Sequence, residues 1–209
     1  MLKNIIFDFG GVIYDIDHNI SKKAFQKLGL NSFDTLYGHQ EQQQLFEQME
    51  RGELTDNEFR SAIRKIIPNN VSDIEIDDAW CALLIGFDKK KIDLLEALRH
   101  NYHLFLLSNT NNIHAKRFIP ELDAYKNFRA LFNDVWLSHE IGKRKPEKEF
   151  YLDLLEKHGM KTEETLFIDD LYANIEAAKN LGIQTYYLNN QQSILDLFNK
   201  DDIFIETNQ

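Results

Sequence analysis

The sequence predicts an α/β fold: a Rossmann-like parallel sheet core with an inserted α-helical domain. Three observations support this class. Five short segments are rich in branched and aromatic residues, most of them alternate with helix-like segments, and one long stretch after the first strand shows only helical patterns. Strands that alternate with helices are typical of a parallel sheet covered on both faces. The five strands are predicted at residues 4–9, 103–107, 134–137, 165–168 and 184–188.

Two helices of the core have clear start and stop signals. One begins at Pro146, a residue that the first helical turn accepts, continues with apolar residues at helical spacing and ends at Gly159. The other is predicted over residues 174–181 and is stopped by Gly182. Each follows a predicted strand, as the alternating pattern requires.

The stretch between the first two strands contains no convincing strand and four predicted helices. Thr55-Asp56-Asn57-Glu58 is a capping box that opens a helix running toward Ile67, and Pro68 breaks it. The other three helices are predicted at residues 21–28, 40–50 and 73–84. The stretch is too long for a simple connection. We therefore predict a helical cap at residues 16–87 and a catalytic core formed by residues 1–15 and 88–209.

The composition restricts the classes of partner. A formal net charge of −10 disfavours nucleic acid and anionic membranes. Cys81 is the only cysteine, so no internal disulfide can form. No apolar run approaches the ~20 residues that span a bilayer, and the N-terminus shows no signal-peptide pattern. We expect a cytoplasmic protein. The sequence leaves its oligomeric state open, and a monomer is compatible with it.

Polar side chains stand at or shortly after the ends of four predicted strands. They are Asp8, Ser108-Asn109, Lys145 and Asp169-Asp170. In an open parallel sheet, ligands bind at the carboxyl ends of the strands, so we expect these groups to converge. Taken singly, most have an ordinary structural explanation as turn formers or surface charges. Two adjacent carboxylates after a buried strand repel each other unless a cation or a donor compensates them.

These groups together predict phosphoryl transfer to a carboxylate. Mg²⁺ held by Asp8 and by one or both acids of Asp169-Asp170 would mask the negative charge of a phosphomonoester. Lys145 would neutralise another phosphoryl oxygen, while the Ser108 hydroxyl and the Asn109 amide would hydrogen-bond the remaining ones. Asp8 would then attack phosphorus and form an aspartyl-phosphate that water hydrolyses. The predicted partner is therefore a small phosphorylated substrate.

The four motifs resemble those of the haloacid dehalogenase-like superfamily. They are Asp8-x-Gly10-x-Val12, Leu107-Ser108-Asn109, Lys145-Pro146 and Asp169-Asp170-x-x-x-Asn174. The resemblance covers essentially the whole chain, because the helical insert matches the C1 cap of that family in position and character. It implies that Asp8 is nucleophile and metal ligand, that Gly10 offers its backbone carbonyl to Mg²⁺, and that Asp170 is the surest acidic ligand.

Within the superfamily the chain is similar to small bacterial phosphatases of the α-D-glucose-1-phosphate phosphatase type. The shared features are the opening from Asp8 to Asp17, Arg51-Gly52-Glu53 before a helix, Leu107-Ser108-Asn109-Thr110-Asn111, and Arg144-Lys145-Pro146-Glu147. This resemblance implies a sugar phosphate, such as glucose 1-phosphate, as substrate.

Gly10 departs from the pattern of the superfamily. Most of its phosphatases carry at this position an Asp that protonates the leaving oxygen, and such help is commonly worth ~10²–10⁴-fold in rate. Three explanations stay open. The substrate has a leaving group that needs little protonation, as in a sugar 1-phosphate or an acyl phosphate; another acid substitutes; or the protein is a weak phosphatase with a binding role. The candidate substitutes are Asp15, Asp17, His18 and His39.

Two other functions compete with a phosphatase. A 2-haloacid dehalogenase also lacks the second Asp, but these enzymes need no metal and do not usually keep the paired acids, so Asp169-Asp170 argues against this function. A non-catalytic binding protein on the same scaffold is motivated by Gly10 alone.

Overall fold

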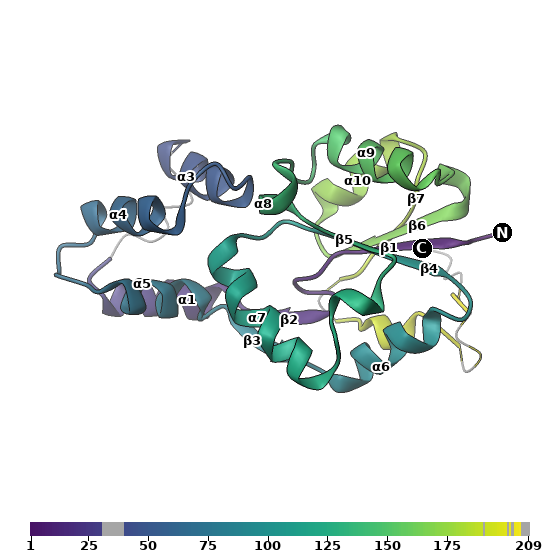
Figure 1. Ribbon diagram of the computed structural model, residues 1–209, viewed down its shortest axis with the longest axis horizontal. Coiled ribbons are helices and arrows are strands. Elements are labelled where there is room, and N and C mark those ends of the chain that lie inside the picture. Colours follow the sequence, from purple (N-terminus) through teal and green to yellow (C-terminus); the bar gives the residue numbers. More distant parts are fainter. Residues whose placement is uncertain (31–39, 190, 200, 202, 206–209) are drawn as a thin grey trace.

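A computed structural model describes the chain apart from residues 31–39, 190, 200, 202 and 206–209. Its core is a five-stranded parallel sheet in the order β5-β4-β1-β6-β7 (Figure 1). The strands are β1 (Asn4–Phe7), β4 (His103–Ser108), β5 (Asp134–Leu137), β6 (Thr165–Asp169) and β7 (Gln184–Tyr187). All five coincide with the predicted strands to within two residues at each end, so the predicted α/β class and the parallel sheet are confirmed.

Helices cover both faces of this sheet. In Figure 1, α9 (Lys148–His158) and α10 (Tyr172–Asn180) lie above it, while α6 (Lys89–Leu98) and α7 (Asn112–Tyr125) lie below. Because successive side chains of a strand point to opposite faces, neighbouring residues of β1 enter different cores. Ile6 packs in the cluster with α9 and α10, whereas Ile5 and Phe7 pack in the cluster on the other face. Four short helices complete the core: α8 (Ser138–Ile141), η1 (Arg129–Leu131), η2 (Thr162–Glu164) and η3 (Ile194–Asp196).

The register of the sheet brings three strand ends to the same level. Phe7 of β1 is paired with Leu106 of β4 on one side and with Ile168 of β6 on the other. The residues that follow Phe7 and Ile168, Asp8 and Asp169, therefore lie side by side at the carboxyl edge of the sheet.

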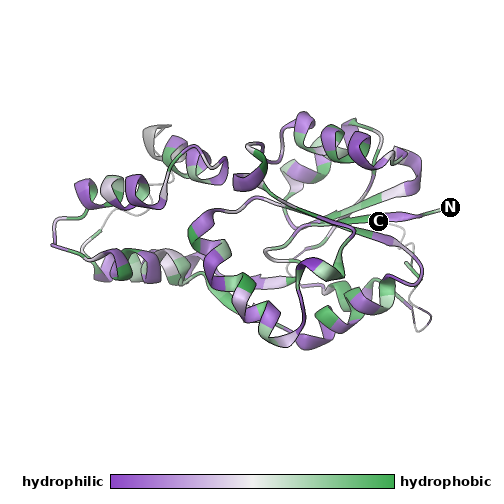
Figure 2. Ribbon diagram, in the orientation of Figure 1, coloured by the Kyte–Doolittle hydropathy of each residue, from purple (hydrophilic) through white to green (hydrophobic). Residues whose placement is uncertain are grey.

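The insert forms a helical cap at one end of the core (Figure 1). Within the described residues its helices are α1 (His18–Lys27), α3 (Gln40–Glu50), α4 (Asp56–Ile66) and α5 (Asp73–Cys81). The capping box predicted at Thr55 is present, and a second one at Ser72 opens α5. The cap has its own apolar core, in which Phe59, Ile63 and Ile76 are fully buried. Figure 2 shows hydrophobic and hydrophilic residues alternating along the helices of cap and core, as expected for amphipathic helices packed on a sheet or on each other.

The prediction that residues 16–87 lack a strand was wrong at both ends of the insert. β2 (Tyr14–Ile16) and β3 (Leu84–Phe87) form a two-stranded antiparallel sheet between the core and the cap. Accordingly α5 ends at Cys81, before the predicted end at residue 84. Both strands are very short, and their partner lies about seventy residues away, so no local periodicity announces them. The predicted boundaries between residues 15 and 16 and between 87 and 88 fall in or at the end of these strands, and the division remains a prediction.

None of the helices described by the structure combines the length and the apolar character needed to cross a bilayer.

Candidate active site

Three carboxylates meet at the carboxyl edge of the sheet. Asp8 follows β1, and its backbone N–H donates to the carbonyl of Ile168 at 2.9 Å, which places it beside the end of β6. Asp169 ends β6, and Asp170 follows. One carboxylate oxygen from each of these three acids lies within 4.8 Å of the others. Asp8 and Asp169 are buried, whereas Asp170 is only half-buried.

The side chain of Lys145 enters this cluster from the loop before α9. Its Nζ donates to Asp8 Oδ1 at 2.6 Å and to Asp169 Oδ2 at 2.7 Å. Lys145 is 1% exposed, which is exceptional for a lysine unless it is paired. The structure therefore brings Lys145 together with Asp8 and Asp169.

Asn109 fixes the backbone of Lys145. Its Oδ1 accepts from the N–H of Lys145 at 2.8 Å, and its Nδ2 donates to the carbonyl of Lys145 at 2.9 Å. The two bonds tie the end of β4 to the Lys145 loop. One Nδ2 hydrogen is used in this pair, so the predicted contact of Asn109 with phosphate would involve the second. Ser108, predicted to bind the same phosphate, is buried at the end of β4.

Asp169 is held by donors on every side. Besides Lys145, the backbone N–H of Leu171 donates to its Oδ1 at 2.7 Å, and Asn174 Nδ2 lies 3.0 Å from both of its oxygens. The carbonyl of Asn174 in turn accepts from the hydroxyl of Tyr151 at 3.2 Å. Asp169 is thus well placed to orient Lys145, whereas the more open Asp170 is better placed to ligate an ion.

Burial and mutual repulsion disfavour the charged forms of Asp8 and Asp170. Burial raises the pKa of Asp8 to about 7; Asp169 and Asp170 raise it further, against the opposing charge of Lys145. Burial and the neighbouring Asp169 raise the pKa of Asp170 to about 6. Burial opposes the charge of Lys145, but Asp169 and Asp8 outweigh it and raise the lysine pKa. A site with this excess of oxygen-borne negative charge fits a hard divalent cation.

A side chain at position 10 would press against the end of the Ile16 side chain. A Cβ built on Gly10 would lie 3.0 Å from Ile16 Cδ1, a contact that requires the neighbour to shift. Ile16 belongs to β2, at the base of the cap. The glycine and the isoleucine therefore form one feature, in which an apolar side chain stands next to the turn that carries Asp8.

A cavity of about 160 Å³ lies between this turn and the cap. Its lining includes Gly10, Ser108 and Asn109 from the core and Phe46, Glu50 and Trp80 from the cap. A larger cavity, about 590 Å³, lies where cap helix α4 meets core helix α7, near Asp56 and Lys116. None of the predicted site residues lines it. The smaller cavity is the one that adjoins the predicted chemistry.

The candidate substitutes for the missing acid occupy different places. Asp15 pairs with Lys91 at 2.7 Å, and Asp17 accepts from the backbone N–H of Asn19 at 2.8 Å as the N-cap of α1. His18 lines the small cavity together with Gly10. His39 lies outside the described residues. Sequence reasoning missed Glu50, which also lines this cavity, because one acid on a polar helix face carries no signal of its own.

Comparison with known proteins identifies the family. The family model described as haloacid dehalogenase-like hydrolase matches residues 2–182. The chain belongs to the haloacid dehalogenase-like hydrolases. It is 36% identical over 188 residues to a D-ribitol-5-phosphate phosphatase of Bacteroides thetaiotaomicron, covering 89% of this chain and 91% of the relative. It is 26% identical over 191 residues to a sesquiterpene phosphatase of Aspergillus oryzae, covering 89% of both.

Solved structures of the family agree with the fold. A family enzyme of Bacteroides thetaiotaomicron, in complex with magnesium and inorganic phosphate, superposes with a TM-score of 0.85 at 35% identity, covering 95% of this chain and 100% of that one. A haloacid dehalogenase-like hydrolase of Porphyromonas gingivalis gives 0.85 at 32% identity, covering 94% and 95%. L-2-haloacid dehalogenase of Xanthobacter autotrophicus gives 0.61 at 17% identity, covering 90% and 78%, and shares the fold alone. The family predicted from the motifs is confirmed, and the family resemblance supports a hydrolase of the phosphatase kind.

Proposed function

We propose that the protein is a Mg²⁺-dependent phosphatase that hydrolyses a small phosphorylated metabolite through an aspartyl-phosphate on Asp8. The observation that carries the proposal is the cluster of three carboxylates within 4.8 Å, with the Lys145 amine against two of them. The relative that holds magnesium and inorganic phosphate supports it, because that structure belongs to the same family and covers the same length.

In this proposal the residues of the cluster divide metal binding, charge neutralisation and nucleophilic attack among them. Asp8, Asp170 and the carbonyl of Gly10 would hold Mg²⁺, which masks negative charge on the phosphoryl group. Asp169 acts mainly by orienting Lys145, and Lys145 neutralises a phosphoryl oxygen. Asp8 attacks phosphorus as the bond to the leaving oxygen breaks, and water then cleaves the acyl phosphate to release inorganic phosphate.

The small cavity favours a small leaving group. Pockets for drug-sized ligands are commonly ~300–1,000 Å³, so a cavity of about 160 Å³ suits a polyol or sugar better than a nucleotide. Its walls combine the rings of Phe46 and Trp80 with the polar side chains of His18 and Glu50. We therefore propose a pentitol or hexose phosphate as substrate. Nucleic acid is not part of the proposal, because the net charge is −10.

Ribitol 5-phosphate and glucose 1-phosphate are the first substrates to compare. The name of the 36% identical relative suggests the former, and the motif resemblance suggests the latter. The two differ in leaving group, because ribitol 5-phosphate releases a primary alcohol and glucose 1-phosphate releases a more acidic anomeric hydroxyl. Their relative rates therefore show how much protonation the site supplies.

Phosphate release from a panel of sugar and polyol phosphates tests the proposal. We expect turnover that requires Mg²⁺, is lost with a chelator and is lost in Asp8→Asn. A protein that releases no phosphate from any ester in the presence of Mg²⁺ contradicts the proposal. Chloride release from 2-chloropropionate without metal would instead indicate a dehalogenase, against which the acid cluster already argues. Binding of phosphate esters without turnover would indicate a non-catalytic protein.

A further inference from the structure

The loop that carries Lys145 is held from two sides. Asn109 fixes the backbone of Lys145 from the core, as described above. From the other side, the loop residues flanking Lys145-Pro146 pair with the end of cap helix α3. Both flanking side chains are charged, and their ion-pair partners belong to the cap: Glu47 and Glu50 for Arg144, and Arg51 for Glu147.

In one flanking pair the loop supplies the positive charge, and in the other the cap supplies it. Arg144 of the loop donates through Nε to Glu50 Oε2 of the cap at 2.7 Å. Arg51 of the cap donates through both terminal nitrogens to the carboxylate of Glu147, with Nη1 at 2.8 Å from Oε2. The four side chains are only 21–29% exposed, so they are shielded more than an ordinary surface pair. The charges of Arg144 and Glu147, on either side of Lys145, are therefore each paired with an opposite charge at the C-terminal end of α3.

The backbone next to Arg51 lies directly against the core. Gly52 has a φ of +67°, and a Cβ built on it would lie 2.2 Å from the carbonyl oxygen of His139 in α8. Figure 1 shows the end of α3 beside α8. This approach leaves no room for a side chain at position 52. The backbone that follows α3 is therefore packed directly against α8 of the core.

We infer that Glu50 and Arg51 of the cap are positioning residues for Lys145, which they align by holding residues 144–147 against the core. The inference rests on the proposed function. When the cap is seated, the loop is clamped between Asn109 and α3, and the Lys145 amine is held against Asp8 and Asp169. When these pairs are broken, the loop loses its attachment to the cap, and Lys145 is held only by its contacts within the core, with Asn109, Asp8 and Asp169.

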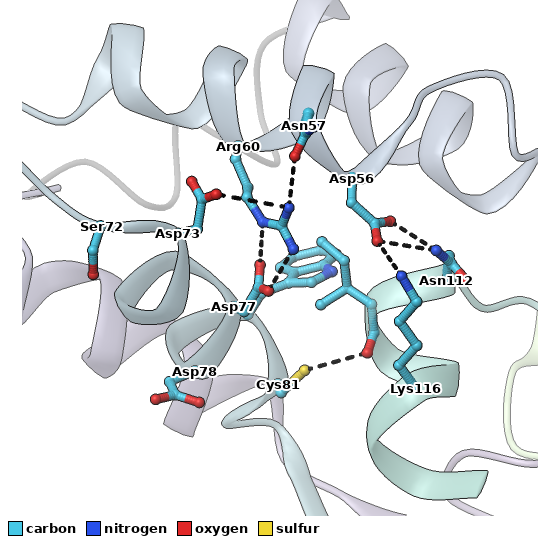
Figure 3. A network of polar contacts seen from close by, with 12 residues as sticks. Asp56, Asn57, Arg60, Ser72, Asp73, Asp77, Asp78, Cys81, Asn112 and Lys116 are labelled. Carbon is cyan, nitrogen blue, oxygen red and sulfur yellow. Dashed lines mark hydrogen bonds and ion pairs between the residues drawn. The ribbon is translucent and has the colours of Figure 1, made fainter.

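A second contact between cap and core provides a matched comparison. Asp56, at the start of α4, accepts from Asn112 Nδ2 at 3.0 Å and from Lys116 Nζ at 2.8 Å, both on core helix α7 (Figure 3). This contact joins the same two parts of the molecule, but it does not touch residues 144–147. Loss of the Asp56 pair should therefore loosen the cap at α7 without releasing Lys145.

Amine labelling with a small acylating reagent tests the inference without relying on activity. Lys145 is 1% exposed and should be protected in the wild-type protein, while the neighbouring Lys148, 69% exposed, serves as internal reference. We expect Arg51→Glu to raise labelling of Lys145 relative to Lys148 by about tenfold or more, because it sets two carboxylates against each other. The double variant Arg51→Glu/Glu147→Arg should restore most of the protection. Asp56→Asn should leave the labelling of Lys145 unchanged. Lys3→Glu, which places two carboxylates together at the amino ends of β1 and β6, should leave it unchanged as well.

Steady-state kinetics then separate positioning of Lys145 from contact with the leaving group. Lys145 acts on the phosphoryl group, which all esters share, so Arg51→Glu should lower kcat for p-nitrophenyl phosphate and for sugar phosphates alike, by ~10–100-fold. A rise in KM for sugar phosphates alone would overturn the inference, as would Lys145 labelling that Arg51→Glu leaves unchanged or that Asp56→Asn raises equally. If the wild-type protein hydrolyses no ester, the proposed function fails while the labelling result still decides this inference.

Discussion

A carboxylate oxygen of Asp170 occupies the space beside the Cα of Gly11. A Cβ built on Gly11 would lie 2.1 Å from Asp170 Oδ2, well inside any permitted contact. Gly11 also has a φ of +75°, a conformation that residues with a side chain rarely adopt. The glycine turn after Asp8 thus lets the Asp170 carboxylate approach the turn closely, and in the proposed site this approach would allow Asp170 and Asp8 to hold one Mg²⁺ ion.

Gly11→Ala should weaken Mg²⁺ binding more than it weakens folding. The added methyl group must displace the Asp170 carboxylate, and moved ligands or their supports typically cost ~10–100-fold in metal affinity. We expect the Mg²⁺ concentration for half-maximal activity to rise by about tenfold or more. Gly159→Ala is the matched control, because Gly159 also has a positive φ, +59°, but has nothing within 4 Å of the built Cβ. Equal Mg²⁺ dependence in the two variants would contradict the assignment.

Asp170→Asn should make the metal-free protein more stable and remove its response to Mg²⁺. Three close carboxylates repel one another, and only one lysine amine contacts them directly in the described structure. Neutralising one acid relieves this repulsion, so we expect Tm without metal to rise by a few degrees, about 2–4 °C. Mg²⁺ should raise the Tm of the wild-type protein by mass action but not that of the variant. Glu156→Gln, which neutralises an exposed acid, should change neither measurement.

Much of the core and of the site could be predicted because their signals are local. The strands of the parallel sheet are buried on both faces and therefore appear as short apolar runs. Asp8, Ser108 and Asp169 stand at the ends of such runs, and the common edge of a parallel sheet brings them together whatever their separation in sequence. Lys145 could be recognised because it precedes Pro146 and the helix that begins there. In the structure its amine contacts both Asp8 and Asp169.

The parts that sequence reasoning missed depend on distant partners. β3 forms only because it pairs with β2 across the whole insert. The Ile16 side chain lies beside Gly10 because the pairing of β2 with β3 fixes its orientation. The residues next to Ile16 in the sequence do not indicate this position. Glu50 reaches the cavity because Gly52 and Arg51 seat the end of α3 on the core. Such features require the relative placement of cap and core, which local periodicity does not contain.

His114 should make the protein less stable as the pH falls from 7 to 4. It is 8% exposed, its ring stacks on Trp80, and its nitrogens lie 3.1 Å from Asn111 Nδ2 and from the carbonyl of Trp80. Burial lowers its pKa from 6.5 to about 4, and the nearby His18 and His139 act in the same direction. Between pH 6.5 and pH 4, His114 therefore binds a proton in the unfolded chain but stays neutral in the folded chain. The free energy of unfolding consequently decreases as the pH falls.

The contribution of His114 to this decrease should be roughly 3 kcal/mol between pH 7 and pH 4. Urea unfolding of the wild-type protein and of His114→Gln at several pH values measures it, because carboxylate titrations contribute similarly to both proteins. The variant should show the shallower dependence on pH. Parallel curves for the two proteins would contradict the prediction, because His114 would then bind its proton equally well in the folded and unfolded states.

Restoring the missing acid at position 10 should work best with a second change. Gly10→Asp alone places its Cβ 3.0 Å from Ile16 Cδ1, a tight contact, so we expect it to accelerate less than a variant in which this contact is relieved. Ile16→Val removes that methyl group and opens the space. We expect Gly10→Asp/Ile16→Val to hydrolyse sugar 6-phosphates or ribitol 5-phosphate faster by ~10–100-fold, within the range that a general acid supplies.

Leaving groups that need little protonation should gain much less from the double variant. The same pair of changes should therefore hardly affect p-nitrophenyl phosphate, and should affect glucose 1-phosphate less than the 6-phosphate. Ile16→Val alone controls for the opened space. Equal acceleration of good and poor leaving groups would show that the new acid does not act by proton transfer. No acceleration of any ester would contradict the prediction that the rate is limited by the missing acid at position 10.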